Sequence, residues 1–259
     1  MLITLAHSVD ADDAFMFYAL ANGKIDTGAL SFRHELCDIE TLNRKAIDMV
    51  YDVTAISFAA YPYIAKSYAL LSVGASVGDK YGPVVVAKKN LSTLKGKVIA
   101  VPGTLTTAFL TLKLYERDFT HKVVAFDKIP EVVSRGQVDA GVLIHEGQIN
   151  YDSFGLHKIV DLGEWWWNQT KLPLPLGGNA IKMTLGNEVA QNVQEIIRKS
   201  IRYALGNKDE VLNYAMKFAR NLDKSRTDKF VGMYVNDFTI ELGSSGRQAL
   251  EILYQKAFS

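Results

Sequence analysis

A histidine closes an apolar, β-branched run in the second half of the chain. The stretch Val138-Asp-Ala-Gly-Val-Leu-Ile-His-Glu-Gly147 predicts a buried parallel strand whose last side chain is His145. Ligands of open α/β sheets bind at the carboxyl ends of the strands, and the unperturbed pKa of histidine lies near the working pH. His145 is therefore a candidate general base. The alternative is a strand-end histidine that only hydrogen-bonds a neighbouring loop.

Two threonines stand where another predicted strand gives way to a helix. The segment Val101-Pro-Gly-Thr-Leu-Thr-Thr-Ala108 places the hydroxyls of Thr106 and Thr107 beside the first amides of that helix. Free amides at a helix N-terminus bind anions. No Gly-Lys-Ser/Thr sequence follows, so we expect a carboxylate rather than a nucleotide triphosphate. Ordinary N-capping by threonine is the alternative.

Polar residues also follow two strands predicted near the start of the chain. Ser57 comes after the strand at 51–56 and could donate to a ligand hydroxyl, or cap the helix predicted at 59–65. Ser8 and three acids crowd the turn after the first strand, and we expect one acid to hold a ligand hydroxyl while the others are solvated caps. These acids are Asp10, Asp12 and Asp13. We take Ser8 and Asp13 as the candidate contacts in this turn.

The remaining reactive residue types carry weaker signals. The five histidines show no metal-ligand spacing, so no metal is expected, and His7 beside the acidic turn is a secondary site candidate. The single cysteine, Cys37, excludes an intrachain disulfide and is expected in the core. One of the adjacent tryptophans at 165–167 is expected to wall a ligand site and the others to pack.

Composition narrows the class of protein. The 259 residues are 48% hydrophobic and 22% charged, which suits one or two domains with a full core. The 29 basic and 28 acidic residues give a net charge of +1 without a basic block, so a nucleic-acid partner is not expected. The apolar window 56–77 is interrupted by Pro62 and Lys66, so no membrane span is expected, and an N-terminus without a charged leader favours the cytoplasm.

The order of predicted elements indicates an α/β protein built from two lobes. Strands and helices alternate through the first 90 or so residues and again from 97 to 162, and the rest is helical. The extended segment at 171–179 and the turn at 81–83 would be two crossings of one boundary. Lobe 1 is therefore expected at 1–87 and 177–259, and lobe 2 at 88–176, with a central cleft as in periplasmic-binding-protein-like folds. The predicted strands are 2–6, 31–36, 51–56, 68–74, 84–88, 97–101, 123–126, 138–144 and 157–162. The predicted helices are 14–22, 39–46, 59–65, 104–115, 129–135, 189–205, 211–219, 229–235 and 247–258.

Several of these segments together resemble the 1,4-dihydroxy-6-naphthoate synthases of menaquinone biosynthesis by the futalosine route. The matching segments are Ser8-Val-Asp-Ala-Asp-Asp-Ala-Phe-Met-Phe-Tyr18, Tyr81-Gly-Pro-Val-Val-Val86, Pro102-Gly-Thr-Leu-Thr-Thr-Ala108, 138–147 and Leu172-Pro-Leu-Pro-Leu-Gly177. Valine stands at position 9, where the family usually has proline, and this weakens the match of the first turn alone. The resemblance implies the type II periplasmic-binding-protein-like fold.

The resemblance also implies a reaction. Cyclic dehypoxanthine futalosine would be split to 1,4-dihydroxy-6-naphthoate without a cofactor. The expected binding partner is therefore the substrate, a small aromatic carboxylate. His145 matches the family's proposed base, and Ser57, Thr106 and Thr107 match its ligand contacts. A non-catalytic solute-binding protein and a chorismate dehydratase of the same pathway remain the alternatives. The oligomeric state cannot be read from the sequence.

Overall fold

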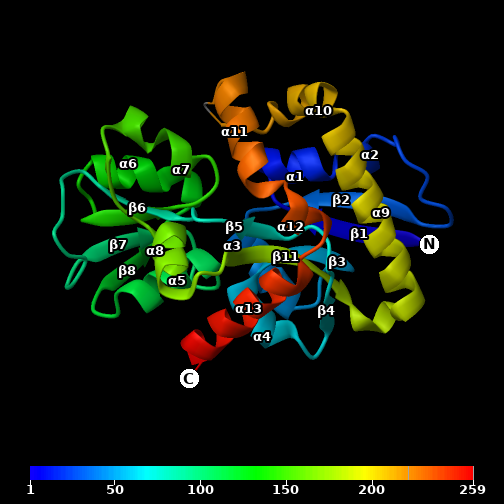
Figure 1. Cartoon of the computed structure of the whole chain (residues 1–259), viewed down its shortest axis with the longest axis horizontal. Helices are drawn as coiled ribbons and strands as arrows, with labels where there is room; N and C mark the ends of the chain where they lie inside the picture. The colour runs from blue at the N-terminus through cyan, green and yellow to red at the C-terminus, as the bar shows by residue number, and fades with distance from the viewer. Residues whose placement is uncertain (221, 259) are drawn as a thin grey trace. The chain divides into compact units, whose positions relative to one another are not determined.

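The computed structural model describes residues 1–220 and 222–258 and divides the chain into two α/β units (Figure 1). Unit 1 comprises Met1–Val77 and Gly177–Ser244, and unit 2 comprises Gly78–Leu176 and the chain from Ser245 onward. The two-lobed α/β prediction is confirmed, but the borders differ from those expected. The strand at Val84–Ala87 pairs inside unit 2, so the first crossing comes earlier than 87, and most of the last helix also groups with unit 2.

The sheet of unit 1 has parallel strands at one edge and antiparallel strands at the other. Its strand order is β2-β1-β3-β11-β4, and β5 also pairs with β11. β1 is parallel to β2 and β3, whereas β11 runs antiparallel to β3 and β4. The extended crossing predicted at 171–179 is thus largely the start of a ladder strand. The strands are β1 (Leu2–His7), β2 (Ser31–Leu36), β3 (Val53–Ser57), β4 (Tyr68–Leu70), β5 (Ser76–Gly78) and β11 (Leu174–Lys182).

Helices from both ends of the chain complete unit 1. In α9, Val193, Ile197 and Ile201 are fully buried at steps of four residues, as the predicted amphipathic pattern requires. The helices are α1 (Ala11–Met16), α2 (Tyr18–Ala21), α3 (Ile39–Ile47), α4 (Tyr61–Ile64), α9 (Asn187–Gly206), α10 (Lys208–Ala215), α11 (Lys224–Tyr234) and α12 (Asp237–Ile240). Short 3₁₀ helices lie at Phe58–Ala60 and Met183–Leu185.

The first helix differs from its prediction. It begins at Ala11 with Asp10 at the N-cap, rather than at 14 after Asp12 or Asp13, and it breaks at Phe17 before α2. Asp12 and Asp13 therefore lie in the first turn of α1, where the partial positive charge of the helix N-terminus favours acids.

The central strands of the unit 2 sheet are buried on both faces. Val85 and Ala87 pack in one cluster with Leu112, and the alternate residues Val84 and Val86 pack in another with Ile129. This two-sided burial explains why these strands are continuously apolar rather than alternating. The order is β10-β6-β9-β7-β8. The strands are β6 (Val84–Ala87), β7 (Val98–Val101), β8 (Thr120–Val123), β9 (Ala140–Leu143) and β10 (His157–Asp161).

One strand of unit 2 lies earlier than predicted. β8 occupies 120–123, not 123–126, and it is an exposed edge strand. Because all four of its residues are exposed, it lacks the apolar pattern on which the prediction depended. The helices of this unit are α5 (Thr107–Tyr115), α6 (Ile129–Ser134), α7 (Gly147–Asn150), α8 (Leu162–Thr170) and α13 (Gly243–Phe258), with 3₁₀ turns at Phe126–Lys128 and Tyr151–Phe154. Across the described residues of both units, no helix is long and apolar enough to cross a membrane.

Candidate functional site

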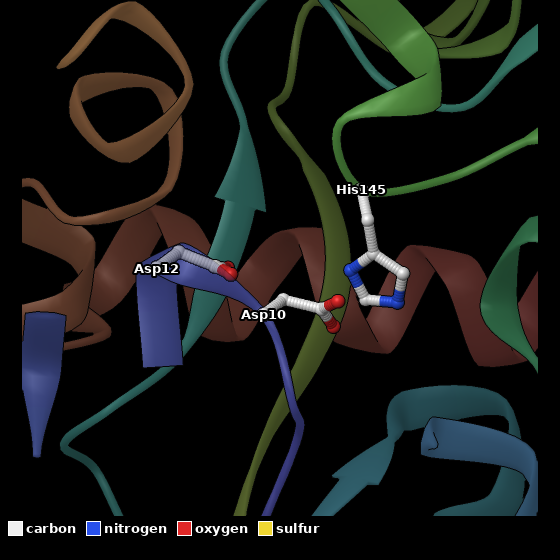
Figure 2. Close-up of side chains that lie close together, drawn as sticks. All are labelled: Asp10, Asp12 and His145. Atoms are coloured by element: carbon white, nitrogen blue, oxygen red, sulfur yellow. The ribbon is translucent and has the colours of Figure 1, made fainter. Parts of the chain in front are cut away.

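The turn after β1 is a buried hydrogen-bonded network. The Ser8 amide donates to Asp13 Oδ2 over 2.6 Å, and the Ser8 hydroxyl donates to Asp10 Oδ2. Asp10 is fully buried, and its other oxygen accepts from Arg220 over 2.9 Å. Asp10 and Asp12 project from the start of α1 in Figure 2. The turn therefore bonds Ser8 to Asp13 and Asp10, and Asp10 to a distant arginine that the sequence did not indicate, while the expected ligand contacts of Ser8 and Asp13 stay a prediction.

A pair of histidines lies beside this turn. The Nε2 atom of His7 is 3.1 Å from Nδ1 of His34, and Nδ1 of His7 is 3.0 Å from the Ser8 carbonyl. Since that carbonyl can only accept, Nδ1 of His7 carries the hydrogen, and His34 then donates to His7. The pKa of each is lowered to about 4, chiefly by burial, and the neighbouring His7 contributes to the lowering for His34. His7 thus supports the Ser8 turn as a neutral, buried group.

The histidine pair also borders a small cavity within unit 1. The cavity has a volume of about 60 Å³ and walls that are mostly apolar. Its lining consists of His7, Ala14, Phe17, Ala21, His34, Leu36, Tyr214 and Phe218. His7 stacks on Phe17, with ring centroids 4.6 Å apart. A volume of this size suits a few water-sized groups, not a fused-ring substrate.

Ser57 is fixed by a side chain that sequence reasoning missed. Asn43, fully buried on α3, accepts from the Ser57 amide over 2.8 Å and donates to the Ser57 hydroxyl oxygen over 3.0 Å. The Ser57 side chain makes no capping bond to the turn at Phe58–Ala60, so the expected alternative of a helix cap is not what the structure contains. With its oxygen accepting from Asn43, the hydroxyl can direct its hydrogen to a ligand acceptor.

The two threonines of unit 2 have different roles at α5. Thr106 is the N-cap: its hydroxyl accepts from the Phe109 amide and donates to the Gly103 carbonyl. Thr107 is the first residue of the helix, and its hydroxyl donates to the Leu176 carbonyl over 2.6 Å. Both hydroxyl hydrogens are used inside the protein. An anion at this helix would therefore be held by the amides of the first turn.

His145 follows β9 in a left-handed backbone conformation. Its φ is +53°, whereas β9 ends at Leu143, so the residue belongs to a tight turn rather than to the strand. The turn is closed by the Gln148 amide, which donates to the His145 carbonyl over 3.1 Å, and the imidazole meets the Phe126 ring edge-on at 4.9 Å. Figure 2 shows the side chain projecting from the loop that follows β9. A positive φ costs a non-glycine residue about 1–3 kcal/mol and is concentrated at functional sites.

The tryptophans pack within unit 2. Trp166 is fully buried and donates to the Pro173 carbonyl over 3.1 Å. Trp165 meets the Tyr115 ring edge-on at 5.6 Å, and the Lys80 ammonium lies 4.6 Å from the ring centre of Trp167. Each of the three indoles of α8 therefore has a packing contact within unit 2. That one of these tryptophans forms the wall of a ligand site stays a prediction.

Neither unit taken by itself offers an evident cation site. Among the described residues of each separate unit, no three His, Cys, Asp or Glu side chains gather within metal-ligand distance. In unit 1 the Asp10 carboxylate is already paired with Arg220.

Cys37 lies after β2, half-buried, and packs against the cluster that contains Leu42 and Tyr51.

Similar solved structures define the class of fold. The alkanesulfonate-binding protein SsuA from Xanthomonas axonopodis matches with a TM-score of 0.68 at 12% identity, covering 90% of this chain and 84% of that one. A ligand-binding component of an import system from Staphylococcus aureus matches with a TM-score of 0.74 at 11% identity, covering 99% and 91%. At these identities the likeness shows the fold alone, which is the two-lobed, periplasmic-binding-protein-like fold.

Closer relatives give the family. The sequence profile described as menaquinone biosynthesis matches residues 3–259. Proteins named 1,4-dihydroxy-6-naphthoate synthase from Thermus thermophilus and Streptomyces coelicolor are 37% and 34% identical, each over 98% of this chain and 93% and 92% of their own lengths. A crystal structure of a protein from Archaeoglobus fulgidus has 53% identity and a TM-score of 0.96, covering 99% of this chain and 96% of that one. The chain belongs to the menaquinone biosynthesis family, and the resemblance drawn from its motifs is confirmed.

Proposed function

We propose that this chain is a 1,4-dihydroxy-6-naphthoate synthase, a carbon–carbon lyase that acts on cyclic dehypoxanthine futalosine. The relatives that carry this name support the activity over nearly the whole chain. The proposal needs no redox cofactor, because the ring gains aromaticity when the carbon–carbon bond breaks and the sugar-derived piece leaves. Since its relatives are biosynthetic enzymes, we place the reaction in the cytoplasm.

His145 is the general base in this proposal, and its position carries the argument. The turn after β9 presents the imidazole beyond the end of a buried strand and keeps φ at +53°. Such a conformation persists only when the surrounding structure enforces it. A neutral imidazole held in this way can take a proton from the substrate, and a positioned acid–base group of this kind contributes about 10²–10⁴-fold to the rate.

The other groups position the substrate in our proposal. The first-turn amides of α5, at and after Thr107, bind the carboxylate, with Thr106 as the cap that keeps them aligned. Ser57 donates its hydroxyl hydrogen to a substrate oxygen, since Asn43 already occupies the hydroxyl oxygen as a donor. Ser8 and Asp13 form a preorganised polar turn that receives a substrate hydroxyl.

The test is to incubate the purified chain with cyclic dehypoxanthine futalosine and identify the products by mass spectrometry. We expect 1,4-dihydroxy-6-naphthoate from the wild type and far less from His145→Asn. Binding without turnover would favour a solute-binding protein instead. Conversion of chorismate with loss of water, and no reaction of the futalosine derivative, would favour the chorismate dehydratase.

A further inference from the structure

β2 is an edge strand whose outer side is exposed. Among the described strands it pairs only with β1, in parallel register from Leu2–Ser31 to His7–Leu36 (Figure 1). Ser31, Arg33 and Leu36 are exposed, and the Leu36 side chain is large and apolar with 42% of its surface accessible. An open edge of this kind is a template for pairing with another strand.

The backbone groups available on this edge can be identified. The Ser31 amide donates to the Met1 carbonyl over 2.9 Å, and the Cys37 amide donates to the His7 carbonyl over 3.2 Å. Because successive residues of a strand direct their backbone groups to opposite sides, the odd-numbered residues face β1. The amides and carbonyls of Phe32, His34 and Leu36 therefore point away from the sheet.

The side chains on this edge are complementary to themselves. We propose that β2 pairs antiparallel with β2 of a second copy of this chain, with His34 opposite His34 of the partner subunit. Arg33 then lies opposite Glu35 of the partner subunit, and Phe32 lies opposite Leu36 of the partner subunit. Such a two-fold pairing uses the same strand on both copies and closes on itself.

The register agrees with the backbone geometry. The outward-facing residues 32, 34 and 36 become the hydrogen-bonded pairs of the new ladder, and 33 and 35 become the non-hydrogen-bonded pairs. Side chains approach most closely in the non-hydrogen-bonded pairs, which is where the arginine and the glutamate meet. Within one chain Arg33 Nε is 3.2 Å from Glu35 Oε1, with the two side chains 60% and 40% exposed. Both charges are therefore accessible to a partner.

The exposed edge of unit 2 lacks this complementarity. The Thr120 and Val124 amides donate to the Lys97 and Val101 carbonyls, so the backbone groups of His121 and Val123 point away from the sheet. An antiparallel pair of β8 strands centred on His121 would set Thr120 against Lys122, and a pair centred on Lys122 would set lysine against lysine, with no opposite charges facing each other in either register. A lysine in the middle of an exposed edge strand is a common device against pairing. The contrast favours β2 over β8 as the self-association surface.

The experiment measures the mass of the full chain by sedimentation equilibrium over a range of concentrations. We expect the wild type to approach twice the 28.7 kDa of one chain. Arg33→Glu sets glutamate against glutamate at both symmetry-related positions and should raise the dimer dissociation constant by about tenfold. The double variant Arg33→Glu/Glu35→Arg restores opposite charges and should return the dissociation constant to within about threefold of the wild type.

Circular dichroism spectra of the variants check that each chain remains folded. A wild type that stays monomeric would overturn the proposal. Arg33 and Glu35 would then be charges that prevent β2 from pairing with another strand. A dimer insensitive to Arg33→Glu, or a charge-swapped double variant that fails to recover, would place the interface elsewhere. None of these outcomes depends on the catalytic activity proposed above, because the readout is mass.

Discussion

The turn after β1 in unit 1 and the turn after β9 in unit 2 hold polar groups in different ways. The first is held by side chains: Ser8 is bonded to Asp13 and Asp10, and Asp10 to Arg220. The second is held by its backbone, with His145 at φ +53° and its carbonyl bonded to the Gln148 amide. The first arrangement suits a rigid polar wall, and the second suits the presentation of one reactive group.

The difference suggests a division of work between the units. In unit 1 the predicted contacts Ser8 and Ser57 are each bonded to a buried side chain, so their hydrogen-bonding directions are fixed before a ligand arrives. Preorganised groups of this kind bind and orient. In our proposal, unit 2 contributes the α5 amides as the anion site and His145 as the base. Changes in unit 1 should therefore affect substrate affinity or stability, and changes at His145 should affect turnover.

The largest effect is expected for His145→Asn. Asparagine tolerates a positive φ better than most residues, so the turn is preserved while the proton acceptor is removed. Turnover should fall by about two to four orders of magnitude with little change in substrate affinity. Steady-state kinetics with calorimetric binding measurements would separate the two. Normal turnover by the variant would make His145 a structural residue.

The histidine pair gives unit 1 a sensitivity to acid. The folded pKa values of His7 and His34 are lowered to about 4, chiefly by burial, whereas an unfolded histidine has a pKa of about 6.5. Between these values the unfolded chain binds protons that the folded chain does not. The free energy of unfolding should therefore fall as the pH drops from about 6.5 to 4, by about 3 kcal/mol from His7 and less from the partly exposed His34.

Urea unfolding at a series of pH values measures this slope. A variant with both histidines replaced by asparagine does not titrate at these positions and should show a shallower loss of stability over the same pH window. The comparison is between slopes, so it holds even if the variant is less stable at every pH. Equal slopes for the two proteins would place the acid sensitivity elsewhere in the chain.

Local patterns predicted the parts of the candidate site that depend on neighbours in sequence. The position of His145 just beyond a buried strand, and of Thr106 and Thr107 at a helix start, both follow from short runs of apolar and hydroxyl residues. The strand itself ends at Leu143 rather than at 144, and the helix begins at Thr107 rather than at 104. Asn43 and Arg220 were missed because they act across 14 and 210 positions of the chain, where no spacing rule applies. The same holds for the pairing of His7 with His34, which requires β1 and β2 to lie side by side.

The fold was predictable to a similar extent. Buried strands and the amphipathic helix α9 lie close to where their periodicity indicated. Three features differ from the prediction: the exposed strand β8, the break in the first helix at Phe17 and the lobe borders. For β8 and the borders the reason is that edge exposure and strand pairing are properties of the assembled sheet. A sequence pattern reflects burial: it is periodic where one side of an element is buried, and it is a continuous apolar run where both sides are.

A smaller effect is expected at Asn43 of unit 1. Asn43→Ala removes both bonds to Ser57 and leaves the buried backbone amide of Ser57 without its acceptor. This should lower the free energy of unfolding by about 1–3 kcal/mol. Ser57→Ala keeps the backbone bond and should cost less in stability. Both variants should bind the substrate more weakly, since neither retains an oriented hydroxyl at residue 57. Denaturant unfolding together with binding measurements checks both effects, and full affinity in the Ser57→Ala variant would remove Ser57 from the proposed site.

The smallest effect is expected at Thr107 of unit 2. Its hydroxyl donates to the Leu176 carbonyl, so Thr107→Val removes that bond while keeping the size of the side chain and the amide at the start of α5. Loss of one neutral hydrogen bond should weaken substrate binding by about 0.5–1.5 kcal/mol, through looser alignment of the first-turn amides rather than through a lost direct contact. Thr107→Ser retains the hydroxyl and is the matched control. If valine weakens binding far more than this, the hydroxyl contacts the substrate itself. If neither variant alters affinity, the carboxylate binds away from the start of α5, and the assignment of an anion site to unit 2 fails.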